Sequence, residues 1–182
     1  MGATVRLRFV ALTLPDGWIE LKRVGAWKLR HVDRRGELGL SLFPVASGVT
    51  MDVPTLLALF AERRQKREES NVSGRELRKE HPEVQRVVPP FHFTFLDESS
   101  WSAGPSFCVT STLRIDTGMG PLRAFDAVWP NPHPTIFSSE WTVSDGTYVV
   151  EASFRDFTEE AFRLGVRDCD TMMRTLRFEG PS

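Results

Sequence analysis

Turn residues recur about every ten residues between positions 91 and 154, and this spacing constrains the fold more than any other feature of the chain. The segments between the turns have strand character and span residues 91–96, 107–115, 122–129, 135–143 and 147–154. Two of the connections, "TGMGP" and "SDG", are short enough for hairpins. The pattern therefore predicts an antiparallel meander of consecutive strands.

Two further segments have the amphipathic pattern of helices, and each carries a single apolar stripe. The first follows Asp52 as its N-cap, and the second spans residues 158–173 with Thr158 as its N-cap. Residues 71–86 are polar, contain Gly and Pro, and are predicted to form a loop. Strands that occur in blocks indicate an α+β fold. We therefore expect a single α+β domain over residues 1–182, with an antiparallel sheet of about six to seven strands and two main helices packed on one face.

The stretch "LTLPDGW" ends the first predicted strand, which covers residues 5–14. Pro15, Asp16 and Gly17 supply turn chemistry, because Pro fixes φ and Asp-Gly tolerates positive φ. Trp18 then begins a second extended segment, so the chain is expected to fold back at this point.

Four stretches carry a resemblance to a known family: the early "LPDGW", the helix "DVPTLLALFAERR", the late "DGTYVVEASF" and the terminal "FTEEAFRLGVRDCDTMMRTLRF". In their order and spacing they resemble the PsbP-like superfamily, which includes the Ran-binding Mog-type proteins and the Eag chaperones of bacterial type VI secretion. The resemblance implies protein binding or assembly, with no shared set of catalytic residues. It also implies that Trp18 packs under the sheet edge as an anchor.

Charge and hydropathy argue against several classes of protein. The formal net charge is −1, whereas a dedicated nucleic-acid binder usually has a clearly basic surface. No stretch approaches the roughly 18–20 apolar residues of a membrane span, and the N-terminal apolar run is too short for a signal peptide. Cys108 and Cys169 are far apart and are expected to be buried free thiols. We therefore expect a cytoplasmic protein with no nucleic-acid partner and no membrane insertion.

The residues that could carry chemistry do not form a recognisable site. The four histidines lack the spacing of a zinc site. Asp168 and Asp170 are two positions apart on a predicted helix and do not face each other, so they are not a convincing metal pair. No nucleophile elbow or phosphate-binding loop occurs. We expect no catalytic residues, no metal and no cofactor.

The aromatic residues offer candidates for partner binding, because Trp is enriched at binding hot spots. Phe137 and Trp141 share one face of the strand predicted over residues 135–143. An adjacent antiparallel strand could bring Trp129 onto the same surface. If helices cover that face, these side chains are core; if it is open, they form an apolar concavity that can hold a peptide or helix. We take Trp129, Phe137 and Trp141 as candidate partner contacts and leave both alternatives open.

The leading hypothesis is a non-enzymatic protein of bacterial type that binds another protein through a sheet face and adjoining loops. The resemblance indicates a secretion-effector chaperone or adaptor. Two alternatives stay open: a small hydrophobic ligand held in a pocket lined by Phe91, Phe93 and Phe95, and an enzyme with a dispersed site. The sequence does not identify the partner or the oligomeric state, and a homodimer also stays open.

Overall fold

A computed structural model of the chain describes residues 2–7, 9–23, 26–34, 36–80, 92–116, 122–124, 127–129 and 135–179. The helices are α1 (Val53–Glu80) and α2 (Glu159–Thr175). The strands are β1 (Thr4–Leu7), β2 (Val10–Thr13), β3 (Trp18–Arg23), β4 (Ala26–His31), β5 (Glu37–Pro44), β6 (His92–Ala103), β7 (Ser106–Asp116), β8 (Leu122–Ala124), β9 (Ala127–Trp129), β10 (Thr135–Ser144), β11 (Tyr148–Asp156) and β12 (Arg177–Phe178).

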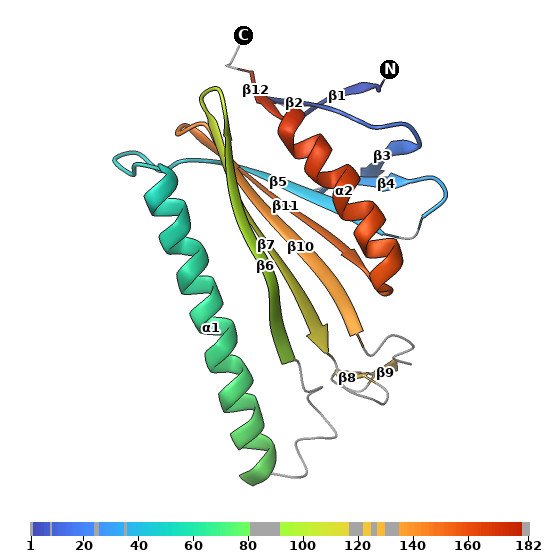
Figure 1. Cartoon of the computed structure of the whole chain (residues 1–182), viewed down its shortest axis with the longest axis vertical. Helices are drawn as coiled ribbons and strands as arrows, with labels where there is room; N and C mark the ends of the chain where they lie inside the picture. The colour runs from blue at the N-terminus through green and yellow to red at the C-terminus, as the bar shows by residue number, and fades with distance from the viewer. Residues whose placement is uncertain are drawn as a thin grey trace.

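Seven strands form the main sheet, in the order β3-β4-β5-β11-β10-β7-β6 (Figure 1). Every pairing in this sheet is antiparallel. The turn between β10 and β11 contains Gly146 at φ 90°, as a hairpin turn of the "SDG" type requires. The α+β fold with an antiparallel sheet of seven strands is therefore confirmed.

Two of the predicted strands fold back on themselves. Residues 5–14 contain the hairpin β1-β2, to which β12 adds as a third strand. Residues 122–129 contain β8 and β9, which pair with each other in a two-stranded sheet. Side-chain alternation reports which face a residue points to, not where a strand reverses, so the sequence pattern missed both reversals.

The turn at "LPDGW" forms as predicted. The Trp18 amide donates to the Pro15 carbonyl at 3.2 Å, and Gly17 has φ 81°. A Cβ atom at Gly17 would lie 2.4 Å from His31 Nε2, so this turn requires glycine. Trp18 is 5% exposed, and its Nε1 donates to Asp168 of α2 at 3.0 Å. Trp18 is confirmed as an anchor between the sheet edge and α2.

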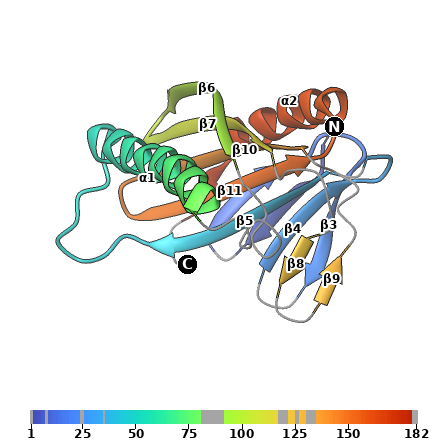
Figure 2. The same ribbon diagram turned by 90° about the horizontal axis from the view of Figure 1, so that it is seen from below.

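The two helices lie on opposite faces of the main sheet. Adjacent residues of a strand point to opposite faces. On β7, Cys108 belongs to the main core with Met172 of α2, whereas Val109 packs with Leu56 of α1. Figure 2 shows α1 and α2 on either side of β7 and β10. The expectation that both helices pack on one face is wrong, because a single apolar stripe shows that a helix is half-buried without showing which sheet face buries it.

The face under α2 holds the main hydrophobic core. Buried residues from six strands of the main sheet and from the β1-β2 hairpin converge on one side of α2. The helix begins at Thr158, whose side chain accepts from the Ala161 amide, so this predicted N-cap is confirmed. Fully buried side chains of this core include Leu12, Leu29, Leu38, Trp141, Val143, Phe154, Met172 and Met173.

The helix α1 extends further than the sequence predicted. It begins where Asp52 Oδ1 accepts from the Thr55 amide at 2.9 Å, which confirms the predicted N-cap. Asn71 is 7% exposed, and its amide both donates to and accepts from the backbone of Phe93, each at 2.8 Å. This pairing satisfies backbone groups on β6, an outer strand of the sheet. The prediction of a loop over residues 71–80 is therefore wrong, and residues 81–86 lie outside the described residues.

Candidate partner-binding groove

Two adjoining hollows lie between α1 and the neighbouring strands. One is mainly apolar, with a volume of about 270 Å³. The other is mainly polar, with a volume of about 510 Å³. Arg63, Thr142 and Glu151 line both hollows, so we treat them as the apolar end and the polar end of one groove, named the α1 groove.

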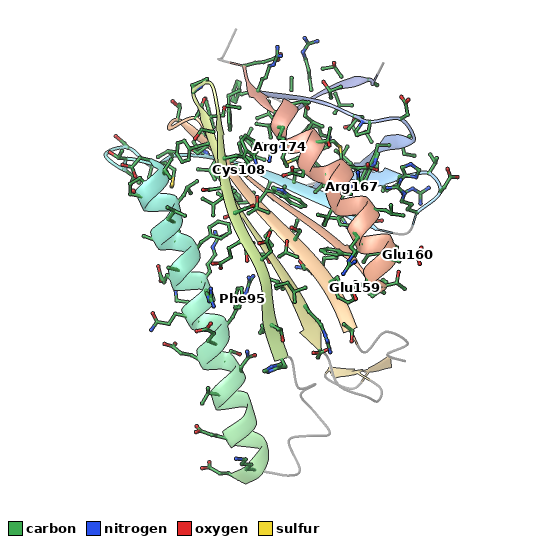
Figure 3. All side chains as sticks on the ribbon, viewed as in Figure 1. Phe95, Cys108, Glu159, Glu160, Arg167 and Arg174 are labelled. Carbon is green, nitrogen blue, oxygen red and sulfur yellow. The ribbon has the colours of Figure 1, made fainter. Side chains whose placement is uncertain are left out.

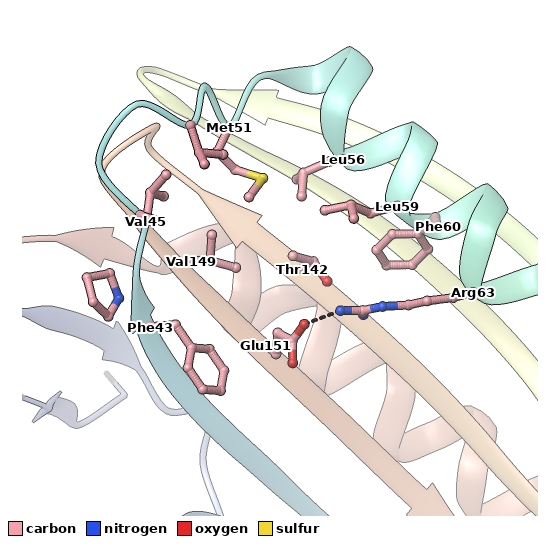
Figure 4. Close-up of a pocket in the computed structure, with 13 residues that line it drawn as sticks. Phe43, Val45, Met51, Leu56, Leu59, Phe60, Arg63, Thr142, Val149 and Glu151 are labelled. Carbon is pink, nitrogen blue, oxygen red and sulfur yellow. Dashed lines mark hydrogen bonds and ion pairs between the residues drawn. The ribbon is translucent and has the colours of Figure 1, made fainter.

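The apolar end lies between the first turns of α1 and the end of β5 (Figure 4). Leu56 and Phe60 are buried on the helix side. Phe43 on β5 and Val49 on the segment that connects β5 to α1 are each 48% exposed. An apolar hollow with exposed apolar side chains at its rim is typical of an interaction site. The residues that line it include Phe43, Val45, Val49, Met51, Leu56, Leu59, Phe60 and Val149.

The polar end continues along the sheet over β11, β5 and β4. Its floor includes the small residues Gly39, Ser41 and Ser153. A Cβ atom added at Gly39 would come no closer than 3.9 Å to the Ser153 backbone and side chain, so the floor is low at this point. Charged side chains surround this floor, namely Lys28, Arg63, Arg67, Glu140, Glu151 and Arg155.

Two of the ion pairs that join α1 to the sheet form the wall of the groove. Arg63 pairs with Glu151 of β11, and Figure 4 shows this pair at the edge of the apolar end. Arg67 Nη2 contacts both carboxylate oxygens of Glu140 on β10, at 2.8 and 3.0 Å. Arg63 and Arg67 are one helical turn apart and so lie on the same face of α1. The mixed charges from Glu62 to Glu69 are typical of a solvated helix end, and only the one-turn spacing of these two arginines indicates a shared contact.

No protein-family model and no curated protein sequence matches the chain. The fold of the chain does match those of solved structures. The solution structure of the cyanobacterial PsbP from Synechocystis sp. PCC 6803 is 13% identical, with 94% of this chain and 87% of that chain covered and a TM-score of 0.52. The Ran-binding protein Mog1p from Saccharomyces cerevisiae is 11% identical, with 98% and 95% covered and a TM-score of 0.54. The chain therefore has the PsbP-like fold.

Within this PsbP-like fold, two of the three candidate contact residues lie on the α2 face. Trp141 is 1% exposed in the main core. Phe137 is half-buried, and its ring centroid lies 5.7 Å from that of Phe162 on α2. β10 lies between β7 and β11, so the strand of Trp129 is not its neighbour, and the Trp129 side chain lies outside the described residues. The role of these residues as partner contacts stays a prediction, and the burial of Trp141 does not favour it.

The aromatic stripe on β6 faces α1. Figure 3 shows Phe95 between β6 and α1. The guanidinium of Arg64 lies 5.0 Å from the Phe95 ring centroid, and that of Arg67 lies 5.7 Å from the Phe93 ring centroid. Arginine side chains of α1 therefore already cover both rings. Phe91, the third residue of the predicted ligand pocket, lies outside the described residues.

The two thiols are free and buried, as the sequence predicted. Burial raises the pKa of Cys108 to about 12 and that of Cys169 well above its ordinary value. Both thiols are therefore protonated at neutral pH, whereas a nucleophilic cysteine needs the thiolate. Within the described residues, no group of three or more His, Cys, Asp or Glu side chains could hold a metal ion. No helix in the same part of the chain is long and apolar enough to cross a membrane.

Asp168 has a structural role that the sequence did not reveal. The sequence places it beside Asp170 on the predicted helix, where it appeared only as half of an unconvincing metal pair. In the structure Asp168 Oδ2 accepts from Trp18 Nε1 at 3.0 Å and from Arg34 Nη1 at 2.7 Å. This carboxylate joins α2 to the segments at both ends of the β3-β4 hairpin. Its partners are more than 130 positions away in the sequence, so no local spacing could have indicated them.

Proposed function

We propose that the chain is a non-enzymatic protein-binding domain that takes a segment of a partner protein into the α1 groove. The observation that carries this proposal is the exposed apolar end of the groove, continuous with a polar end whose floor is surrounded by charged side chains. An apolar anchor of a partner would bury itself between Phe43 and Phe60, and the surrounding charges would provide a polar rim. A buried apolar centre with a polar rim is the usual anatomy of a protein interface.

The similar structures support the same class of function. Mog1p is described as Ran-binding, so one protein with this fold has a protein partner. By extension, we propose that this chain acts as a chaperone or adaptor in a bacterial cytoplasm, with a secreted effector as its most specific candidate client. This finer assignment rests on the resemblance in sequence pattern and fold.

The test is capture of a partner by wild-type protein and by a variant in which the apolar end carries a charge. The tagged protein is expressed in its own host and purified, and co-purifying proteins are identified by mass spectrometry. In Phe43→Asp, a carboxylate enters the apolar end, where burial without a counter-charge is unfavourable. Leu164→Asp is the matched control, because Leu164 is 47% exposed on α2, close to the 48% of Phe43.

We expect one protein that the wild type and Leu164→Asp retain and that Phe43→Asp loses. Thermal unfolding of each variant shows that the fold is intact. A partner retained equally by all three proteins, or lost with Leu164→Asp alone, would contradict binding in the α1 groove.

A small apolar ligand is a second candidate for the same hollow. The volume of about 270 Å³ is near the lower limit of typical small-molecule pockets. Native mass spectrometry distinguishes the two functions: a retained mass on the wild type that Phe43→Asp lacks would favour a ligand, whereas a clean mass for both proteins would favour the partner segment.

A further inference from the structure

Three cationic residues lie around Glu37 on the sheet, and two of them, Lys28 and Arg155, line the α1 groove at the end furthest from its apolar end. Lys28 Nζ pairs with Glu37 Oε2 at 3.0 Å. Glu37 also lies opposite Arg30 on β4 and opposite Arg155 on β11 in the strand register. All four residues alternate onto the sheet face that α1 partly covers. We name Lys28, Arg30 and Arg155 the basic cluster.

The basic cluster differs from the rest of the groove in its charge balance. Arg63 and Arg67 are each matched by a glutamate on the sheet. Arg30 and Arg155 are exposed and form no ion pair within the residues that the structure describes. The cluster therefore has an excess of positive charge, although the chain as a whole has a formal net charge of −1. Exposed cations without partners in a neutral protein attract carboxylates at short range.

The strand β5 connects the basic cluster to the apolar end. Glu37, Gly39, Ser41 and Phe43 follow one another on the same face of this strand. Six residue steps of a strand span about 20 Å, so the charged end and the apolar end are separated by roughly that distance. Gly39 and Ser41 are small and keep the surface of β5 low between the two ends.

We propose that the occupant of the α1 groove is an acidic–apolar segment of another protein, with an apolar side chain in the apolar end and one or more carboxylates on the basic cluster. This inference rests on the proposed function and specifies its partner. The separation of about 20 Å corresponds to about six residues of extended chain or about 13 residues of α-helix. Charge complementarity at Arg30 and Arg155 selects the acidic segment over a basic or uncharged one.

The experiment uses a phage-displayed library of random peptides of about 16 residues, which is long enough to span the groove in either conformation. Selection is run on wild type and on the double variant Arg30→Gln/Arg155→Gln, in which two exposed cations become neutral. The matched control is Arg163→Gln/Arg167→Gln, which removes the same charge from two exposed positions on α2. Figure 3 shows Arg167 on α2, away from α1.

We expect wild type and the α2 control to enrich peptides that combine Asp or Glu with a large apolar residue. The Arg30→Gln/Arg155→Gln variant should retain the apolar residue and lose the acidic one. The best peptide, measured by fluorescence anisotropy, should bind this variant about three- to tenfold more weakly, and it should bind wild type more weakly as NaCl rises from about 50 to about 300 mM.

The other outcomes separate this inference from the proposed function. Enriched peptides that need Phe43 but carry no acidic residue would overturn the acidic segment and leave the groove as a binding site. No enrichment on any of the proteins would overturn the proposed function itself. Tighter binding of a labelled single-stranded oligonucleotide than of the best peptide, with the same dependence on Arg30 and Arg155, would overturn the inference in favour of nucleic acid.

Discussion

The two faces of the main sheet differ in how completely they are covered. The α2 face is closed by a helix whose side chains meet a continuous apolar core, in which Trp141 and Phe154 are each 1% exposed. The α1 face is held by a small apolar cluster around Leu56 and Phe60 and by ion pairs to β10 and β11. Beyond this apolar cluster and these ion pairs, the α1 face opens into the α1 groove.

This difference indicates that the α2 face mainly stabilises the fold and that the α1 face mainly recognises a partner. Burial of apolar surface is the dominant favourable term in folding, and the α2 face contains most of it. The α1 face has cations, carboxylates and an accessible apolar hollow, which contribute less to folding but provide selectivity for a partner. Substitutions on the α2 face are therefore expected to change the free energy of unfolding, and substitutions on the α1 face are expected to change the affinity for a partner.

The largest expected effect is on the α2 face. Trp141→Ala removes a fully buried side chain and leaves a cavity, so we expect a loss of about 3–5 kcal/mol in the free energy of unfolding. Phe43→Ala on the α1 face is the comparison, because Phe43 is 48% exposed, and we expect a loss of less than about 1 kcal/mol. Urea denaturation followed by tryptophan fluorescence and circular dichroism measures both. Equal losses in the free energy of unfolding would show that the α1 face contributes as much to folding as the α2 face.

A smaller effect is expected where α1 meets β6. Asn71→Ala leaves the N–H and C=O of Phe93 without their side-chain partner, which should cost about 1–3 kcal/mol. Amide hydrogen exchange should show faster exchange at Phe93 than in wild type. Gln65→Ala, at an exposed amide on the same helix, is the control and should change stability by less than about 0.5 kcal/mol. If Phe93 exchanges at the same rate in Asn71→Ala as in wild type, the Asn71 pairing does not protect this strand.

The smallest effect is a pH dependence of the core. In the unfolded chain Cys108 ionises near its ordinary pKa of 9.0, whereas burial raises the folded pKa to about 12. Between these values the unfolded state binds fewer protons, so stability is complete below pH 9 and falls as the pH rises toward 12. The slope contributed by Cys108 should approach about 1.4 kcal/mol per pH unit. Urea titrations of wild type and Cys108→Ala between pH 8 and 10.5 measure this slope, and parallel curves would show that Cys108 is not buried as described.

Local patterns predicted the elements of the fold well. Turn residues located the hairpin β10-β11, and Asp52 and Thr158 marked the starts of both helices. These features depend on neighbouring residues, so one stretch of sequence contains them. The predicted pairing across "TGMGP" is wrong, because β7 pairs with β6 and β10 and not with the strand predicted over residues 122–129. The end of α1 could not be predicted locally, because Asn71 pairs with Phe93, which lies 22 positions away in the sequence.

The candidate site was much harder to predict, because it depends on which sheet face each helix covers. Phe137 and Trp141 have the composition of a binding surface and lie against α2. Arg63 and Arg67 have the composition of a solvated helix end and form a wall of the α1 groove. Their partners, Glu151 and Glu140, are more than 70 positions away, so only the tertiary structure brings them together.

The most direct test of this account is site-specific photo-crosslinking in the native host. A photoreactive p-benzoyl-phenylalanine replaces Phe43 at the rim of the α1 groove or Leu164 on the outer side of α2, two positions of almost equal exposure. The account predicts a crosslinked adduct of higher mass from position 43 and none from position 164. An adduct from position 164 alone, or from neither position, would contradict the assignment of partner binding to the α1 face.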